Sequence, residues 1–419
     1  MKFGLFYEHQ LPKPRDQEQW DPDAEHKMMK NALDQLELAD SIGFDYVFEV
    51  EHHFLEEYSH SSAPEIFLAA ASQRTKNMRL GHGIVLMPPR YNQPARVAER
   101  ISTLDLVSDG RVEFGTGESA SEMEMGGFGI QREDKKQMWE EATRECVKMM
   151  TNTPYAGVEG AFFGMPERNV VPKPLQKPHP PLWVASSRRE TTMVGARLGM
   201  GSLGFAFETP DEMRERTEHY FSLVREECYP IGQAINPALG VVNVLSCFDT
   251  DEEAIDKGLE GAQFFAYSLA YYYNPFTGGN HKPGKTNIYQ KFIDSPPDQR
   301  WGPFGDAFRG FGGFDATGKP AAEEPKDEVT RALWRAAQRG GCIGSPEFVK
   351  DTLRQFENAH LDLMIFVAQC GARKHEDVMD SIYRTGTKVI PEFKERHAEH
   401  QKWRAHQLEG VEYPVNSSI

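Results

Sequence analysis

Cysteine and positive charge are both scarce in this sequence. Only five cysteines occur in 419 residues, none at CxxC spacing, which is typical of free thiols in a reducing cytosol. Lysine and arginine total 47 against 63 aspartates and glutamates, which gives a formal net charge of −16. A field of this sign repels polyanions and argues against nucleic acids and anionic membrane surfaces as partners. We therefore expect a cytoplasmic protein that binds neither nucleic acid nor membranes.

Long apolar runs and several familiar catalytic motifs are also absent. No apolar stretch approaches the ~20 residues that span a bilayer. The opening segment "MKFGLFYEH" (1–9) lacks the apolar core and the cleavage site of a signal peptide. Neither a G-x-S-x-G nucleophile elbow nor a P-loop occurs. Core-forming bulk is plentiful, because 39% of the residues are hydrophobic and 26 Phe and 14 Tyr are present.

Short apolar runs alternate with longer amphipathic segments along the chain. Eight of these runs are predicted strands: 2–8, 44–50, 78–87, 111–117, 181–187, 201–207, 240–248 and 361–369. Apolar strands joined by helical crossovers imply a parallel sheet that is buried on both faces. Eight such units predict an α/β fold, the (β/α)8 TIM barrel, as a single domain over residues 1–400. A doubly wound open sheet is the alternative.

The alternation breaks over residues 274–344, directly before the last strand unit. This insertion is rich in Gly, Pro and aromatic residues and shows one predicted helix, near 326–339. A long insertion inside a compact fold is usually a functional lid or a disordered excursion, and the aromatic content favours a lid over the barrel mouth. Residues 401–419 are predicted to be a C-terminal tail.

Polar side chains collect where the predicted strands end, which is where a TIM barrel places its site. They are Glu8 and His9, Glu51 to His53, His82 to Ile84, the turn 115–121, the segment 185–190 and Gln369. The turn "GTGESA" (115–120) matches the dinucleotide pattern G-x-G-x-x-A. The acid expected about 20 residues later is Asp134, which begins a predicted helix and does not end a strand. A tight turn that lets a ligand approach is the other interpretation.

Two further stretches carry potential chemistry. "WVASSRRET" (183–191) places two serines and two arginines where a helix begins, which suits a phosphate site, unless Ser187 only caps the helix. "FEVEHHFLEEYSH" (48–60) holds three histidines. Consecutive side chains on an extended segment point to opposite sides, so one of His52 and His53 can face the pocket. A metal site, a structural role and an acid/base histidine all remain open.

The combination of five segments resembles the bacterial luciferase-like flavin-dependent monooxygenases. The segments are "MKFGLF" (1–6), "EHHF" (51–54), "RLGHGIVLMPP" (79–89), "PARVAERISTLDLVSDGRVEFGTG" (94–117) and "PPLWVASSRRET" (180–191). The resemblance covers residues 1 to about 270 and resumes weakly over 345–390. It implies a TIM barrel and a homo-oligomer, a dimer or tetramer. It also implies reduced FMN from a separate NAD(P)H:flavin reductase, with O2 activated as a C4a-peroxyflavin. With the aromatic lid, it suggests a small apolar or aromatic organic substrate.

The resemblance also assigns roles to particular residues. His52 matches the family's catalytic histidine beside the flavin. Gly83 and Ile84 match a strand-3 bulge against the flavin ring, which in the family is a non-proline cis peptide. We therefore expect a cis bond between them.

The remaining matches concern the FMN phosphate and the strand-4 turn. Ser187 and Arg188 match the loop that grips the phosphate, with Ser186 nearer the ring. Gly117 and Glu118 match the strand-4 turn near the flavin. The luciferase has a reactive cysteine and a phosphate-binding arginine in that turn, and their absence here argues against light emission.

Other functions stay open at this point. Deazaflavin-dependent oxidoreductases share the barrel, and a flavin-binding protein without turnover would need the same pocket. A metal-dependent barrel hydrolase is a third alternative, although we expect no metal, because His52 and His53 cannot face one ion from an extended segment.

Overall fold

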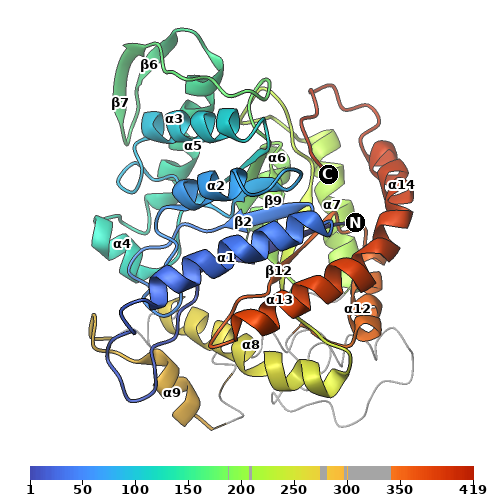
Figure 1. Ribbon diagram of the computed structural model, residues 1–419. Helices are drawn as coiled ribbons and strands as arrows, with labels where there is room; N and C mark the ends of the chain where they lie inside the picture. The colour runs from blue at the N-terminus through green and yellow to red at the C-terminus, as the bar shows by residue number, and fades with distance from the viewer. Residues whose placement is uncertain (187, 207–209, 274–280, 297–299, 301–340) are drawn as a thin grey trace.

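Eight parallel strands close into a barrel in the computed structural model (Figure 1). The structure describes residues 1–186, 188–206, 210–273, 281–296, 300 and 341–419. Around the ring the strands are β1 (Lys2–Tyr7), β2 (Tyr46–Glu49), β3 (Arg79–His82), β5 (Val112–Gly117), β8 (Leu182–Ala185), β9 (Gly201–Phe205), β10 (Leu239–Cys247) and β12 (Leu363–Val367). Pairing of β9 with β10 and of β12 with β1 completes the closure. The TIM-barrel prediction is confirmed, and the open-sheet alternative is wrong.

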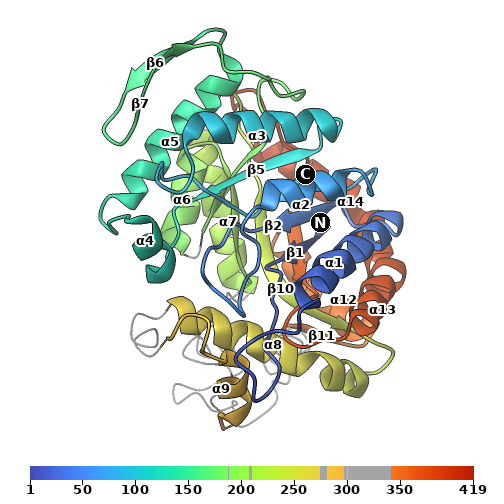
Figure 2. The same ribbon diagram turned by 60° about the vertical axis from the view of Figure 1, so that its left-hand side comes forward.

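Helices surround the barrel and follow most of its strands (Figures 1 and 2). The outer helices are α1 (Ala24–Ser41), α2 (Pro64–Ser72), α3 (Pro94–Val107), α5 (Lys135–Thr151), α6 (Arg189–Arg197), α7 (Pro210–Glu226), α8 (Asp251–Tyr273), α12 (Pro346–Asn358), α13 (His375–Arg384) and α14 (Ile390–Gln407). Their starts follow local chemistry. Proline occupies the first turn of α2, α3 and α12, and Ser345 caps α12 by accepting from the Phe348 amide.

Large aromatic side chains fill the barrel interior. Phe48 and Trp183 meet edge to face inside the ring and are fully buried. The Trp183 indole donates to Glu113 (2.6 Å), and Glu113 also pairs with Arg79 at the start of β3. The interior is therefore a packed core that leaves the chemistry to the rim.

The C-terminal residues pack beneath the barrel. The predicted tail boundary at 401 lies inside α14, and the chain then turns back toward the starts of the strands. Ser418 accepts from Lys2 Nζ through its carbonyl (2.6 Å) and from the Tyr46 hydroxyl through its side chain (2.8 Å), and it donates to Glu113 (2.5 Å). These contacts cover the end of the barrel opposite the candidate site.

An antiparallel hairpin outside the barrel was missed in the sequence. It consists of β6 (Tyr155–Glu159) and β7 (Gly164–Arg168) and follows α5. Both views place it at the end of the molecule opposite α8, with the short helix α4 (Glu122–Phe128) between the two ends (Figures 1 and 2). Its alternating pattern is weak because six of its ten residues are exposed.

Only the ends of the predicted lid fall in the described part of the chain. They include α9 (Ile288–Asp294) and β11 (Cys342–Gly344), while the predicted helix near 326–339 and most of 274–344 lie outside the described residues. Glu57 anchors the first end, because its carboxylate accepts from the amides of Lys13, Ile288 and Tyr289. Lys13, itself buried, donates to Glu56 (2.8 Å) and to the Thr286 carbonyl (2.7 Å).

A close approach between β3 and β5 requires glycine at position 115. An added Cβ at Gly115 would lie 1.9 Å from the His82 carbonyl oxygen, and one at Gly117 would lie 2.5 Å from Ile84 Cδ1. Because the first obstacle is backbone, it cannot rotate away.

We predict that Gly115→Ala destabilises the fold by at least about 1–3 kcal/mol, the usual range for overpacking. The matched control is Gly126→Ala in α4, where an added Cβ meets nothing within 4 Å. Urea unfolding of both variants measures the difference. Equal stability of the two variants would contradict the close β3–β5 contact.

Candidate active site

The candidate site lies at the mouth formed by the C-terminal ends of the strands. The last turn of α8 reaches this mouth, where the Ser121 hydroxyl donates to the Tyr272 carbonyl (3.5 Å). Tyr273 at the end of α8 presents its ring edge-on to His52, with centroids 6.3 Å apart. The mouth therefore has an aromatic wall on the side of α8.

His52 lies between two carboxylates. Its Nδ1 is 2.9 Å from Glu124 Oε1, and its Nε2 is 3.5 Å from Glu8 Oε2. Glu8 follows β1, His52 follows β2, and Glu124 comes from α4 beyond β5. Closure of the barrel thus brings one acid to each ring nitrogen.

The two acids control the charge of His52. Burial alone would lower the pKa of this imidazole, but the negative charge of Glu124, and then of Glu8, outweighs burial and raises the pKa to about 9. Burial raises the pKa of Glu124, but contacts with His52, Ser119 and the His53 amide lower it by more. The pKa of Glu124 therefore lies below its ordinary value. His52 is therefore a cation at neutral pH.

Glu124 is the principal residue that the sequence analysis missed. The polar positions considered after strand 4 ended at residue 121, one residue before the short helix that carries Glu124. The signal available was an acidic helix directly after a glycine-rich strand end, "ESASEMEM" (118–125). Its pairing with His52 could not be predicted, because the two residues lie 72 positions apart in the sequence.

His53 belongs to a separate network on the other side of the segment. Its Nε2 is 3.1 Å from Glu51 Oε1, and Glu51 also accepts from Asn92 Nδ2 (2.7 Å) and from the Leu86 amide (2.8 Å). The His53 ring packs edge-on against Phe128, with centroids 5.0 Å apart. The geometry thus separates the two histidines, with the carboxylate pair around His52.

The bond between Gly83 and Ile84 is trans, so the predicted cis peptide is wrong. Cis bonds in the described residues precede Pro154, Pro172 and Pro178 only. The Gly83 amide donates to the Glu49 carbonyl (2.7 Å), and the Ile84 carbonyl accepts from the Glu51 amide (3.1 Å). The trans form satisfies both groups, and nothing offsets the ~3 kcal/mol that a non-proline cis bond costs. Both residues are half-exposed at the mouth.

A lysine contacts the turn after β5, the fourth strand of the barrel. Lys135 at the start of α5 lies 3.1 Å from Glu118 Oε1 and donates to the Ser119 carbonyl (2.6 Å). Gly117 lies against Ile84, so the turn and the strand-3 bulge are adjacent. The sequence analysis placed Gly117 and Glu118 near the site but gave no role to Lys135.

The loop after β8, the fifth strand of the barrel, has one of its predicted residues at the surface and one in the barrel wall. The Ser186 hydroxyl is directed into the barrel wall, 2.5 Å from the Ser202 hydroxyl, and does not face the mouth. Ser187 lies outside the described residues. Arg188 is exposed and occupies the N-cap position of α6 without a side-chain capping bond. An arginine beside the first amides of a helix suits an anion.

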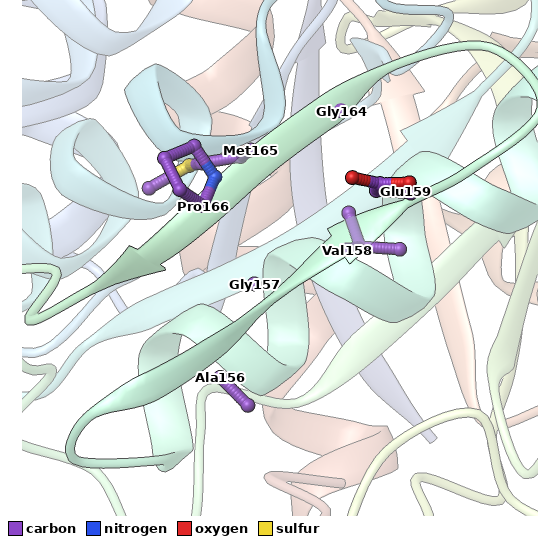
Figure 3. A pocket seen from close by; sticks show the side chains of 7 residues that line it. All are labelled: Ala156, Gly157, Val158, Glu159, Gly164, Met165 and Pro166. Carbon is purple, nitrogen blue, oxygen red and sulfur yellow. The ribbon is translucent and has the colours of Figure 1, made fainter.

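Other parts of the described structure offer less. No group of three or more His, Cys, Asp or Glu side chains in the described residues could hold a metal ion. No described helix is long and apolar enough to cross a membrane. A surface hollow over the β6–β7 hairpin is lined by Ala156, Gly157, Val158, Glu159, Gly164, Met165 and Pro166 (Figure 3). Glu159 is its single ionisable side chain, which makes the barrel mouth the better candidate site.

Comparison with known proteins agrees with this geometry. The family model described as luciferase-like monooxygenase matches residues 1–363. The chain belongs to the luciferase-like monooxygenase family. The family match spans the whole barrel up to the start of β12.

Curated relatives in this family are distant. A Sinorhizobium fredii protein named y4wF is 33% identical over 177 residues, 41% of this chain and 50% of its own length. The chain thus spans about half the length of the first curated relatives it matches. The oxygenase component of a flavin-dependent trigonelline monooxygenase from Acinetobacter baylyi is 23% identical over 65% of this chain and 72% of its own length. An F420-dependent glucose-6-phosphate dehydrogenase of Amycolatopsis mediterranei is 24% identical over 54% of this chain and 67% of its own length.

Solved structures of luciferase-like monooxygenases share the fold. The monooxygenase RslO1 from Streptomyces bottropensis superposes with a TM-score of 0.68 at 21% identity, covering 94% of this chain and all of that one. The oxygenating constituent of 3,6-diketocamphane monooxygenase from Pseudomonas putida, solved with FMN, gives a TM-score of 0.65 at 19% identity and covers 93% of this chain and 98% of that one.

We predict that Glu124→Gln lowers the pKa of His52 by at least about one pH unit, because the nearest anion is removed. Histidine NMR titration of the free protein measures it. Glu122→Gln, an exposed acid of the same helix that bonds to Arg132 (2.8 Å), is the control and should leave the His52 pKa unchanged. An unaltered pKa in the Glu124 variant would contradict the pairing.

The same pair makes stability depend on pH. A pKa raised from 6.5 to about 9 on folding adds stability that is fully present below about pH 6.5 and is lost as the pH rises through about 9. We therefore expect the loss of unfolding free energy in Glu124→Gln to be larger at pH 6 than at pH 9.5. Urea unfolding at the two pH values tests this, and a loss that does not change with pH would refute it.

Proposed function

We propose that this chain is a two-component, flavin-dependent monooxygenase. It takes reduced FMN from a separate NAD(P)H:flavin reductase and uses O2 to oxygenate a small, apolar or aromatic organic substrate. The observation that carries the proposal is the His52 cation at the barrel mouth, clamped by Glu124 and Glu8 and adjacent to the half-exposed Gly83–Ile84 bulge.

The residues at the mouth fit an FMN molecule. The trans Gly83–Ile84 bulge offers an accessible face without bulk at Gly83, and Gly115 and Gly117 leave room for it to sit close to β5. Arg188 and the first amides of α6 suit the phosphate. Ser186, expected nearer the ring, bonds to Ser202, and Ser187 lies outside the described residues, so Arg188 is the phosphate ligand on which the proposal rests. Bound reduced flavin would supply the electrons that activate O2.

The protein's own contribution is charge, orientation and exclusion of water. The His52 cation can donate a hydrogen bond or a proton from Nε2 to an anion that forms in the mouth, while Glu124 fixes the ring through Nδ1. Tyr273, Tyr58 and Phe265 provide an aromatic wall that shields this position from water. An apolar wall beside one cationic donor suits an uncharged organic substrate.

The described architecture supports the proposed partner reductase. Beyond the barrel, the described residues form only the two-stranded β6–β7 sheet, and no second nucleotide-binding sheet accompanies it. The printed name of the Acinetobacter baylyi relative, an oxygenase component, supports the same division of labour.

The runner-up function is a deazaflavin-dependent oxidoreductase. The F420-dependent relative supports it, because it shares part of this barrel. A flavin-binding protein without turnover is the non-enzymatic alternative. Purified protein with a flavin reductase, NADH, FMN and 18O2 discriminates among the three: label appearing in a small aromatic or apolar product supports the monooxygenase. Tighter binding of F420 than of FMN, without label in any product, would favour the runner-up.

We predict that Arg188→Ala weakens FMN binding roughly 10- to 100-fold, since a charge-assisted contact is worth about 1.5–3 kcal/mol. Arg189→Ala is the matched control, because Arg189 is also exposed but faces Glu215 at 3.9 Å. Flavin fluorescence titration gives both affinities. Equal affinities in the two variants would indicate that the phosphate binds elsewhere, and the turn after β5 would be the next position to test.

We predict that His52→Ala lowers product formation by at least about 100-fold while most of the FMN affinity remains, because a positioned acid/base group is lost. His53→Ala should mainly reduce stability, since His53 bonds Glu51 and packs on Phe128. Coupled NADH and product assays with thermal melts separate the two. A reversed outcome would make His53 the catalytic group.

A further inference from the structure

We propose that Glu8 is a second proton-holding group of this site, and that it exchanges a proton with His52 between Glu8 Oε2 and the ring Nε2. The activity part of this inference rests on the proposed monooxygenase function, whereas the proton exchange concerns the free protein alone. The geometry that carries it is the side-by-side placement of a buried carboxylate and one imidazole nitrogen.

The Glu8 side chain is held in place at the end of β1. It is 2% exposed, its Oε1 accepts from the Tyr58 hydroxyl (2.8 Å), and its backbone carbonyl accepts from the Ser59 hydroxyl (2.7 Å). Tyr58 is itself buried against Phe265, with centroids 5.9 Å apart. The carboxylate therefore cannot turn away from His52 toward water.

The second oxygen of Glu8 faces the imidazole without a hydrogen bond. Oε2 is buried and has no hydrogen-bond partner in the described part of the chain. It lies 3.5 Å from His52 Nε2 without forming a hydrogen bond, and a small movement of the ring would form one. A buried acceptor without a donor is unfavourable, so a proton placed between the two atoms is favoured.

Glu124, the partner of the other ring nitrogen, has more hydrogen-bond donors than Glu8. Glu124 accepts from the His53 amide (2.9 Å) and the Ser119 hydroxyl (2.5 Å) besides its contact with His52 Nδ1. Several donors keep this carboxylate ionised, and its pKa is lowered. Burial raises the pKa of Glu8, and its contacts with His52 and Tyr58 do not cancel the rise. Two acids whose environments push their pKa values apart mark a stable anion and a proton carrier.

The proposed exchange keeps charge and atoms in balance. One Nε2–H bond of His52 breaks and one Oε2–H bond of Glu8 forms, and no electrons move. Glu8, His52 and Glu124 together carry one negative charge before and after the transfer. The titratable groups that face this pair are Tyr58, Tyr273, Glu51 and Glu124, and the negative charge of Glu124 favours the proton on His52 as the resting position. His52 can thereby act as a donor and as an acceptor at the same nitrogen.

Glu8→Gln tests the proposal, because the amide oxygen can still accept from Tyr58 while the proton-accepting carboxylate is lost. Histidine NMR titration of the protein without flavin should show the His52 pKa lowered by at least about one pH unit. The fold, by circular dichroism, and FMN affinity should stay within about threefold of the parent. An unchanged His52 pKa in this variant overturns the proposal, whatever the activity of the protein.

The activity arm separates a proton carrier from a structural residue. In the oxygenase assay, Glu8→Gln should lower kcat by about 10-fold or more with KM unchanged, and the alkaline limb of the pH profile should move to lower pH. Ser59→Ala, the control, removes the donor to the Glu8 backbone carbonyl but keeps the carboxylate, so kcat should fall less than threefold. A larger effect from Ser59→Ala than from Glu8→Gln would show that the position of the loop, and not the Glu8 carboxylate, sets the activity, and would overturn the proposal. Absence of product from the parent protein itself would count against the proposed function and leave the titration as the deciding result.

Discussion

Hydrogen bonds between β9 and β10, and between β12 and β1, close the ring of eight strands. Every strand of the ring is parallel to its neighbours, so all C-terminal ends meet at one rim. Glu8, His52, Ile84 and Gly117 are far apart in the chain but share that rim. The packed interior around Phe48 and Trp183 then prevents the ring from collapsing or sliding, which fixes the distances across the mouth.

The barrel was predictable from the sequence because its signals are local: eight apolar runs, each long enough for a strand, separated by amphipathic segments. This pattern places His52 after one run and Gly117 at the end of another, and the family resemblance then selects His52 over His53. Glu124 and the raised pKa of His52 were not predicted, because they depend on a contact across 72 residues, and an isolated imidazole would titrate near 6.5. The cis bond between Gly83 and Ile84 was inferred from likeness alone, and the hydrogen bonds of this chain favour trans.

Acidity at the mouth is tolerable because each glutamate there contacts at least one hydrogen-bond donor or cation. Glu51 accepts hydrogen bonds from Asn92 and the Leu86 amide and pairs with His53. Glu118 forms an ion pair with Lys135. Burying ionised carboxylates is costly unless hydrogen bonds and opposite charges replace water. The donors come from rigid strands and helix starts, so the site is preorganised before a ligand arrives. The overall charge of −16 therefore does not prevent a local cation, at His52, from dominating the reacting position.

The segment that carries His52 also carries Glu56 and Glu57, which tie it to residues 284–289 at the start of the insertion. The loop that carries His52 and residues 284–289 therefore depend on each other, both in protein engineering and in evolution. Grafting this histidine loop onto another barrel without its partner segment would leave Glu57 with a buried charge and no amides to bind it. Lys13 pairs with the Glu56 carboxylate (2.8 Å), so substitutions at these two positions should be tolerated only in matched combinations, and sequences of close relatives should vary at them together.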